Sequence, residues 1–112
     1  MKTNQDLTKL IVKLKKTKKP VWAKVAKILE KPKRKRHDVN VDHVSRHTKA
    51  GETAIVPGKL LGTGELRHSV NVAAYSFSKQ ALEKIEAAKG KSYSIEKLIE
   101  QNPTGKGVKV LE

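Results

Sequence analysis

The sequence contains no cysteine among its 112 residues. This absence excludes a disulfide framework, a cysteine-ligated zinc site, an iron–sulfur cluster and a thiol nucleophile. The chain also lacks any apolar run approaching the ~20 residues that a membrane-spanning helix needs. Residues 1–6 lead into an amphipathic segment rather than an apolar secretory signal. We therefore expect neither a signal peptide nor a membrane partner.

Aromatic side chains are scarce, and the chain has only Trp22, Tyr75, Phe77 and Tyr93. Sequence-specific recognition of RNA usually relies on aromatic rings that stack on unpaired bases. No predicted strand carries two or three such rings. Trp22 shares an apolar helix face with Val25 and Leu29, so we expect it in the core, with a stacking platform as the alternative. Any RNA recognition should therefore depend on shape and backbone.

Acidic residues are too few to balance the basic ones. The chain has 25 lysines and arginines against 11 aspartates and glutamates, which gives a formal net charge of +14. Self-repulsion opposes folding, so a partner must supply negative charge, and nucleic acid is the leading candidate. Residues 1–49 hold 16 basic and 4 acidic residues, against 9 and 7 in residues 50–112. We expect a single domain over residues 1–112, with 1–49 as its basic, helical, nucleic-acid-contacting half and 50–112 as a mixed α/β module.

Hydrophobic periodicity and capping residues predict five helices. Their positions are residues 5–16, with Asn4 as the expected N-cap, then 20–31, 42–47, 79–88 and 95–99. Residues 39–44 also alternate like a short strand. The third helix is preferred over that alternative. The fourth should begin after the cap Ser78 and bury Ala81, Leu82, Ile85 and Ala88. Gly90 is expected to adopt a left-handed stop just past its end.

Short strands are predicted between these helices. Their positions are residues 53–56, 59–61, 69–75, 92–93 and 108–111. Pro57 and Gly58 are expected to separate the first two strands, and residues 102–107 to form a loop. Basic helices followed by short strands that alternate with helices predict an α/β fold.

Candidate nucleic-acid contacts are the exposed cations, because each one that neutralises a phosphate releases a counterion and so drives binding. The two densest clusters are Lys15, Lys16, Lys18 and Lys19, then Lys33, Arg34, Lys35 and Arg36. Glycine neighbours suit Lys59 and Lys106 to close phosphate approach. Two pairs, Arg46-His47 and Arg67-His68, are candidate contacts to RNA backbone or bases. For every candidate, the alternative is an ordinary solvated surface or turn.

Catalytic and metal-binding patterns are incomplete. Gly90-Lys91-Ser92 is similar to the end of a phosphate-binding loop, but Ile85 stands where that motif needs glycine. His43 and His47 are spaced for a metal on a helix, but no glutamate follows His43 and the neighbourhood is cationic. We therefore predict no enzyme activity, no metal, no cofactor and no small-molecule substrate.

An ordered set of motifs resembles one family. The most specific motif is Val56-Pro57-Gly58-Lys59-Leu60-Leu61-Gly62. Others, in order, lie at residues 29–32, 39–41, 72–74, 77–78, 85–88 and 99–108. Across nearly the whole chain they resemble the archaeal and eukaryotic large-subunit ribosomal proteins of the eighteen-e type, which are related to the bacterial large-subunit protein fifteen. The short length resembles the archaeal branch.

The resemblance implies an irregular β-β-α superhelical core and a structural role on large-subunit rRNA. It also implies a place in the cytoplasmic ribosome among neighbouring ribosomal proteins, and no catalysis. Thr63 and Lys89 depart from the family pattern, and neither lies in the basic half of the chain. An architectural DNA-binding protein is the alternative that shares the same charge. An enzyme acting on an anionic substrate is a third, and it lacks any assembled set of catalytic residues.

Overall fold

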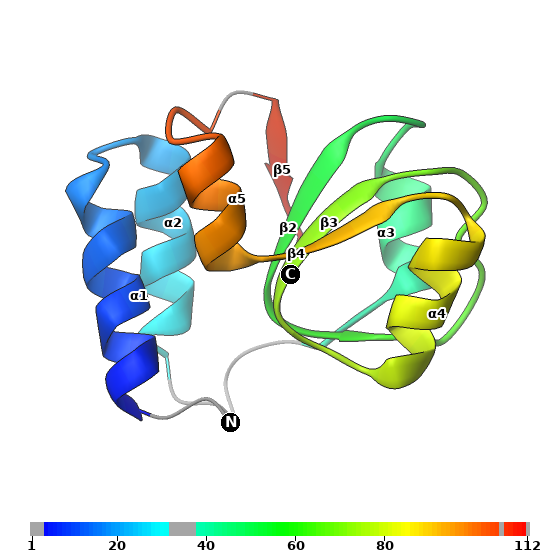
Figure 1. The fold of residues 1–112 in the computed structure, drawn as a ribbon, viewed down its shortest axis with the longest axis horizontal. Coiled ribbons are helices and arrows are strands. Elements are labelled where there is room, and N and C mark those ends of the chain that lie inside the picture. The colour runs from blue at the N-terminus through cyan, green and yellow to red at the C-terminus, as the bar shows by residue number, and fades with distance from the viewer. Residues whose placement is uncertain (1–3, 32–37, 106, 112) are drawn as a thin grey trace.

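Helices cover both faces of one sheet in the computed structural model, which describes residues 4–31, 38–105 and 107–111 (Figure 1). The helices are α1 (Asn4–Lys16), α2 (Pro20–Leu29), α3 (Val41–His47), α4 (Lys79–Ala87) and α5 (Ile95–Gln101). The strands are β1 (Val39–Asn40), β2 (Thr53–Leu61), β3 (Asn71–Phe77), β4 (Lys91–Ser94) and β5 (Val108–Val110). Figure 1 shows α1, α2 and α5 on one side of the sheet and α3 and α4 on the other. The predicted α/β class is confirmed.

The strands pair in parallel throughout the described residues, around a central β2. One edge of β2 pairs with β3, and β4 extends the sheet beyond β3. The other edge is shared by two short strands. There β5 pairs with residues 53–55, and β1 pairs with residues 60–61. The strand that precedes α3 and the strand that follows α5 are therefore held by the same central strand.

Strand β2 corrects one prediction, because Pro57 and Gly58 do not end a strand. β2 continues through both residues, and its register with β3 shifts between Val56 and Lys59. A bulge of this kind accommodates proline, which has no N–H to donate to the ladder. Pro57 and Gly58 are both buried. The two predicted strands are thus one strand with an irregularity at its middle.

Alternation along β2 and β3 supplies two hydrophobic clusters, one on each face of the sheet. Ile55 and Ala73 pack with Trp22 beneath α1, α2 and α5. Their neighbours in sequence, including Val56 and Val72, pack beneath α3 and α4. Successive strand residues point to opposite faces, so a sheet covered on both sides needs apolar residues at nearly every position. The apolar runs of β2 and β3 meet this requirement.

Local signals set the starts of α2, α4 and α5 as predicted, whereas α1 begins at Asn4, the expected cap, and α3 begins one residue early at Val41. The Ser78 hydroxyl accepts a hydrogen bond from the Ala81 N–H, and the Ser94 hydroxyl accepts one from the Lys97 N–H, each at 3.1 Å. Pro20 occupies the first turn of α2. The preferred helix near residues 42–47 is confirmed as α3. The strand-like alternation before it reflects the two-residue strand β1, so both patterns in that segment have a structural counterpart.

The end and the buried face of α4 differ from prediction. Lys89 has the left-handed backbone, with φ of +61°, instead of Gly90. Glycine is needed at position 90 because a Cβ there would lie 2.3 Å from the Val70 carbonyl oxygen. Leu82, expected in the buried stripe, is 41% exposed. Ala81 and Ile85 alone are buried along this helix, so its apolar face is narrower than the sequence pattern indicates.

Candidate nucleic-acid interface

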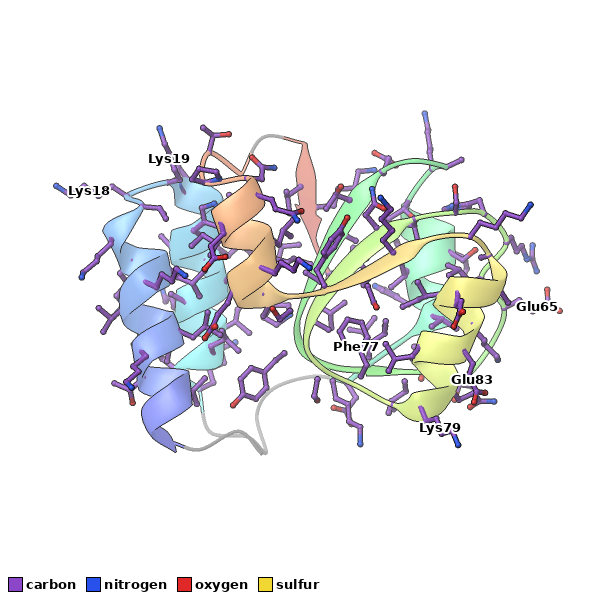
Figure 2. All side chains as sticks on the ribbon, viewed as in Figure 1. Lys18, Lys19, Glu65, Phe77, Lys79 and Glu83 are labelled. Atoms are coloured by element: carbon purple, nitrogen blue, oxygen red, sulfur yellow. The ribbon has the colours of Figure 1, made fainter. Side chains whose placement is uncertain are left out.

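The turn between α1 and α2 presents the first predicted lysine cluster to solvent. Lys15 and Lys16 end α1, where positive side chains interact favourably with the helix terminus, and Lys18 and Lys19 form the turn. All four are exposed. Figure 2 shows Lys18 and Lys19 pointing outward, away from the body of the protein. Within the described ranges, Lys16, Lys18 and Lys19 form no ion pair. Their ammonium groups are available to a polyanion.

Lys15 differs from the rest of this cluster because it has an acidic partner. Its ammonium group pairs with the carboxylate of Glu30, directly after α2. Both side chains are exposed, so the pair contributes little to stability. It does neutralise the only acidic residue between positions 17 and 31. Among the four predicted contacts, Lys15 is the one whose charge the fold already balances.

The loop between α5 and β5 packs against the first turn of α2. The indole N–H of Trp22 donates to the carbonyl oxygen of Pro103 at 3.0 Å. Gly105 is buried with φ of +70°, and a Cβ there would lie 2.0 Å from Cγ1 of Val21. Residues 103–105 therefore lie beside the start of α2. The structure brings together the lysine turn and part of the glycine loop, which the sequence presents as separate candidates.

Five predicted contacts lie outside the described residues. They are Lys33, Arg34, Lys35, Arg36 and Lys106. The structure does describe the residues that precede each of these two segments. Lys31 is exposed immediately after α2, and Gly105 is buried against α2. Both segments thus connect in sequence to the α1–α2 part of the structure.

The end of α3 carries Arg46 and His47, and each has a neighbour on the same helix. Arg46 Nη2 lies 2.7 Å from Asp42 Oδ2, and the His47 ring centroid lies 4.3 Å from that of His43. Burial lowers the pKa of His43, and the positive charges of His47 and Arg46 act in the same direction. Asp42 offsets part of this positive charge. Arg46 and His47 are both exposed and accessible to a partner.

His68 and Arg67 have different surroundings, although they are adjacent. His68 Nε2 lies 3.1 Å from the Ser45 carbonyl oxygen and 3.5 Å from the Thr48 hydroxyl. The Arg67 backbone N–H donates to the Ser45 hydroxyl at 3.1 Å. The Arg67 side chain itself is 75% exposed, with Glu65 as a partner at 3.6 Å. His68 therefore fastens this loop to α3, and Arg67 is the member of the pair that faces solvent.

Lys59 lies in β2, directly after the irregularity at Pro57 and Gly58. Its side chain is exposed, whereas the two residues before it are buried. The Gly58 backbone is covered by the protein, so a phosphate contact at this position depends on the Lys59 side chain.

Three further lysines join the candidate contacts once the helix is seen. Lys24, Lys27 and Lys31 are exposed, at spacings of three and four residues along α2 and the residues that follow it. They are not consecutive in the sequence, so no basic run marks them. A helical projection of residues 20–31 places them on the side opposite Trp22 and Leu29, and that periodicity is the signal that identifies them.

Two other features, a metal-ligand cluster and a membrane-spanning helix, are not found among the described residues. There, no group of three or more histidines, cysteines, aspartates or glutamates is arranged to hold a metal ion. Among the helices in the same ranges, none combines the length and the apolar character needed to cross a membrane.

Comparison with known proteins identifies the family. Residues 3–93 match the family of ribosomal proteins that is described by its members 50S-L15 and 50S-L18e together with a 60S counterpart. The chain belongs to this family. A relative named "Large ribosomal subunit protein eL18" from Methanoregula boonei is 46% identical to this ribosomal protein over 98% of the chain and 94% of the relative. Relatives of the same name from Methanothermobacter thermautotrophicus and Methanococcus maripaludis are 44% and 46% identical. Each match covers 99% of this chain, with 95% and 96% of the relatives.

Family membership confirms several predictions. The chain is a structural ribosomal protein of the cytoplasmic ribosome and not an enzyme. The resemblance to the archaeal branch is confirmed by relatives that come from archaea. The enzyme alternative is thereby excluded.

Proposed function

We propose that this chain binds large-subunit rRNA and stabilises its folded form through basic contacts directed mainly at the RNA backbone, beside neighbouring ribosomal proteins. One observation carries the proposal. The α1–α2 turn places Lys16, Lys18 and Lys19 in solvent without an acidic partner in the described residues. Three uncompensated cations on a chain of net charge +14 favour a polyanionic partner.

The aromatic residues support backbone contacts over base stacking. Trp22 is fully buried, and its indole N–H is already bonded to Pro103. Tyr75 and Tyr93 are half-buried and pack against the same hydrophobic cluster. No described strand offers a row of exposed rings to unpaired bases, which is the usual basis of single-stranded RNA recognition.

The type of nucleic acid is supported by the relatives. Each carries a name that places it in the large ribosomal subunit. The charge alone fits an architectural DNA-binding protein equally well. The relatives therefore favour rRNA, and the mixed α/β architecture is more than a small groove-binding protein needs.

A binding experiment separates the two nucleic acids. The purified protein is titrated into labelled large-subunit rRNA transcript and into duplex DNA of equal phosphate number, at several salt concentrations. We expect tighter binding to the transcript, with a preference that persists as salt rises, since counterion release alone favours neither polymer strongly. Equal affinities at every salt concentration would overturn the proposal.

Sedimentation of a cell lysate provides the matching test in the cell. The protein should migrate with the large ribosomal subunit and remain there after a high-salt wash. Recovery in the chromosomal fraction would favour the DNA-binding alternative, and recovery in the free pool would contradict both.

A further inference from the structure

A stripe of lysines runs along the outer face of α2 and ends at Lys31, two residues beyond the helix. Lys24, Lys27 and Lys31 follow one another at helical spacing, and all three are exposed. The opposite face of the same helix is buried through Trp22, Val25, Ala26, Ile28 and Leu29. The orientation of α2 is therefore fixed by its core contacts, and the lysine stripe is held toward solvent.

The stripe has no compensating acid among the described residues. None of its three lysines forms an ion pair there, and the one acidic residue between positions 17 and 31 of the sequence, Glu30, is paired with Lys15. Like charges three and four residues apart destabilise a helix that stands alone. A partner that supplies negative charge removes this repulsion.

The apolar content of this face argues against a protein partner. Besides the lysines and Glu30, its exposed positions are Pro20 and Ala23, both small. Protein interfaces have a core that is depleted of charge and enriched in large apolar or aromatic side chains. The outer face of α2 has the opposite composition, which fits a phosphate backbone.

The stripe also joins the two densest basic clusters of the sequence. Lys18 and Lys19 precede the first residue of α2, and Lys31 leads in sequence to Lys33, Arg34, Lys35 and Arg36. A ten-residue helix is about 15 Å long, so α2 spans the distance between the turn and Lys31. The lysines along it supply charge at intermediate points.

We propose that α2 lies lengthwise along an RNA backbone, with Lys24, Lys27 and Lys31 each neutralising a phosphate. The RNA strand that contacts the α1–α2 turn continues along these three lysines. This inference rests on the proposed rRNA binding and adds to it the path of the RNA over the protein.

Figure 2 supports the choice of this side of the molecule. Lys18 and Lys19 project from the end occupied by α1 and α2, whereas Glu65 and Glu83 lie at the opposite end, beside α4. An RNA strand along α2 is therefore far from these carboxylates. The α4 end supplies a matched control, because Lys79, Lys89 and Lys91 are also exposed and form no ion pair within the described ranges.

The test compares two triple variants that each lose three positive charges. One carries Lys24→Gln, Lys27→Gln and Lys31→Gln, and the other carries Lys79→Gln, Lys89→Gln and Lys91→Gln. Glutamine has nearly the helix propensity of lysine at the helical positions 24, 27 and 79, and the other three positions are exposed, so both variants should remain folded, as circular dichroism will verify. Binding to the large-subunit rRNA transcript is measured against salt concentration.

For the α2 variant, the slope of log affinity against log salt should become shallower by about 2 to 3, at about 0.7–0.9 for each lost phosphate contact. The control should keep the wild-type slope. If the wild type binds the transcript while the two variants have equal slopes, the path along α2 is wrong and rRNA binding stands. If the wild type itself shows no preference for the transcript, the proposed function fails first.

Discussion

The indole N–H of Trp22 donates a hydrogen bond to the Pro103 carbonyl oxygen, at 3.0 Å, across 81 positions of sequence. Trp22 itself is fully buried in the cluster formed by α1, α2 and α5. One side chain therefore anchors the basic helices to the core and to the α5–β5 loop. This part-buried hydrogen bond fixes the start of α2, which directly follows the lysine turn.

The substitution Trp22→Phe should destabilise the protein by about 1–3 kcal/mol, because the Pro103 carbonyl loses its donor and the smaller ring leaves a void. Chemical denaturation measures this loss. Gly105→Ala acts on the same contact from the other side. It should cost at least as much, since its Cβ would meet Val21 and its φ is +70°. A Gly105→Ala variant as stable as wild type would show that the loop is not packed on α2.

Lys18→Gly should raise stability while it weakens RNA binding. Lys18 has φ of +56°, which costs a side-chain-bearing residue about 1–2 kcal/mol, while glycine loses about 0.5–1 kcal/mol of additional chain entropy. The net gain in the free energy of unfolding should be about 0.5–1 kcal/mol. The salt slope for the rRNA transcript should become shallower by about 0.7–0.9.

Lys89→Gly is the matched control for this substitution. Lys89 has φ of +61° and follows α4, on the other side of the sheet. It should gain similar stability without any change in the salt slope. A shallower slope for Lys89→Gly would place an RNA contact at the end of α4. That result would contradict the contact proposed at the α1–α2 turn.

Replacing Lys33, Arg34, Lys35 and Arg36 by alanine should weaken binding to the rRNA transcript without affecting the fold. The salt slope should become shallower by about 0.7–0.9 for each contact removed. Thermal unfolding followed by circular dichroism should match wild type. An unchanged slope would remove this segment from the contact surface.

The ion pair between Lys13 and Glu100 should give α1 and α5 a pH-dependent link. Lys13 Nζ lies 2.7 Å from Glu100 Oε1. The hydrogen bond from Lys13 lowers the pKa of Glu100 below 4.5, and the same bond raises the pKa of Lys13 above 10.5. The stabilisation is therefore present between pH 4.5 and 10.5. It is lost as the pH falls through the lowered pKa of Glu100 or rises through the raised pKa of Lys13.

Denaturation of wild type and Glu100→Gln across this range measures the link. The difference in unfolding free energy should be small, because both groups are exposed, and should shrink with added salt. It should vanish at both extremes of pH. A difference that does not vary with pH would point to packing instead of charge.

The order of helices and strands was predictable because its signals are local. Ser78 and Ser94 cap helices, Pro20 begins one, and the apolar runs of β2 and β3 mark buried strands. The errors arose where a distant neighbour decides the conformation. Gly90 is required by the Val70 carbonyl, and Pro57 is tolerated because β2 bulges beside β3. Neither partner is visible in the sequence around those positions.

The candidate site was predictable only as far as charge is continuous in sequence. The cluster around Lys18 and Lys19 was found, and the structure leaves it exposed. The partners of Lys15 and His68 lie on other elements, so their engagement with Glu30 and Ser45 could not be foreseen. Lys24 and Lys27 are separated in sequence and share a surface only because the chain forms a helix. A run of consecutive charges therefore does not reveal them.

The sharing of one edge of β2 between β1 and β5 has a consequence for biosynthesis. A ribosome makes α1 and α2 first, yet these helices pack on α5, and β5 fills its place beside residues 53–55 only after every other strand has been translated. The nascent chain therefore exposes α1 and α2 before the α5 residues that pack against them exist. The core that packs against α1 and α2 is therefore complete only once α5 and β5 have been translated.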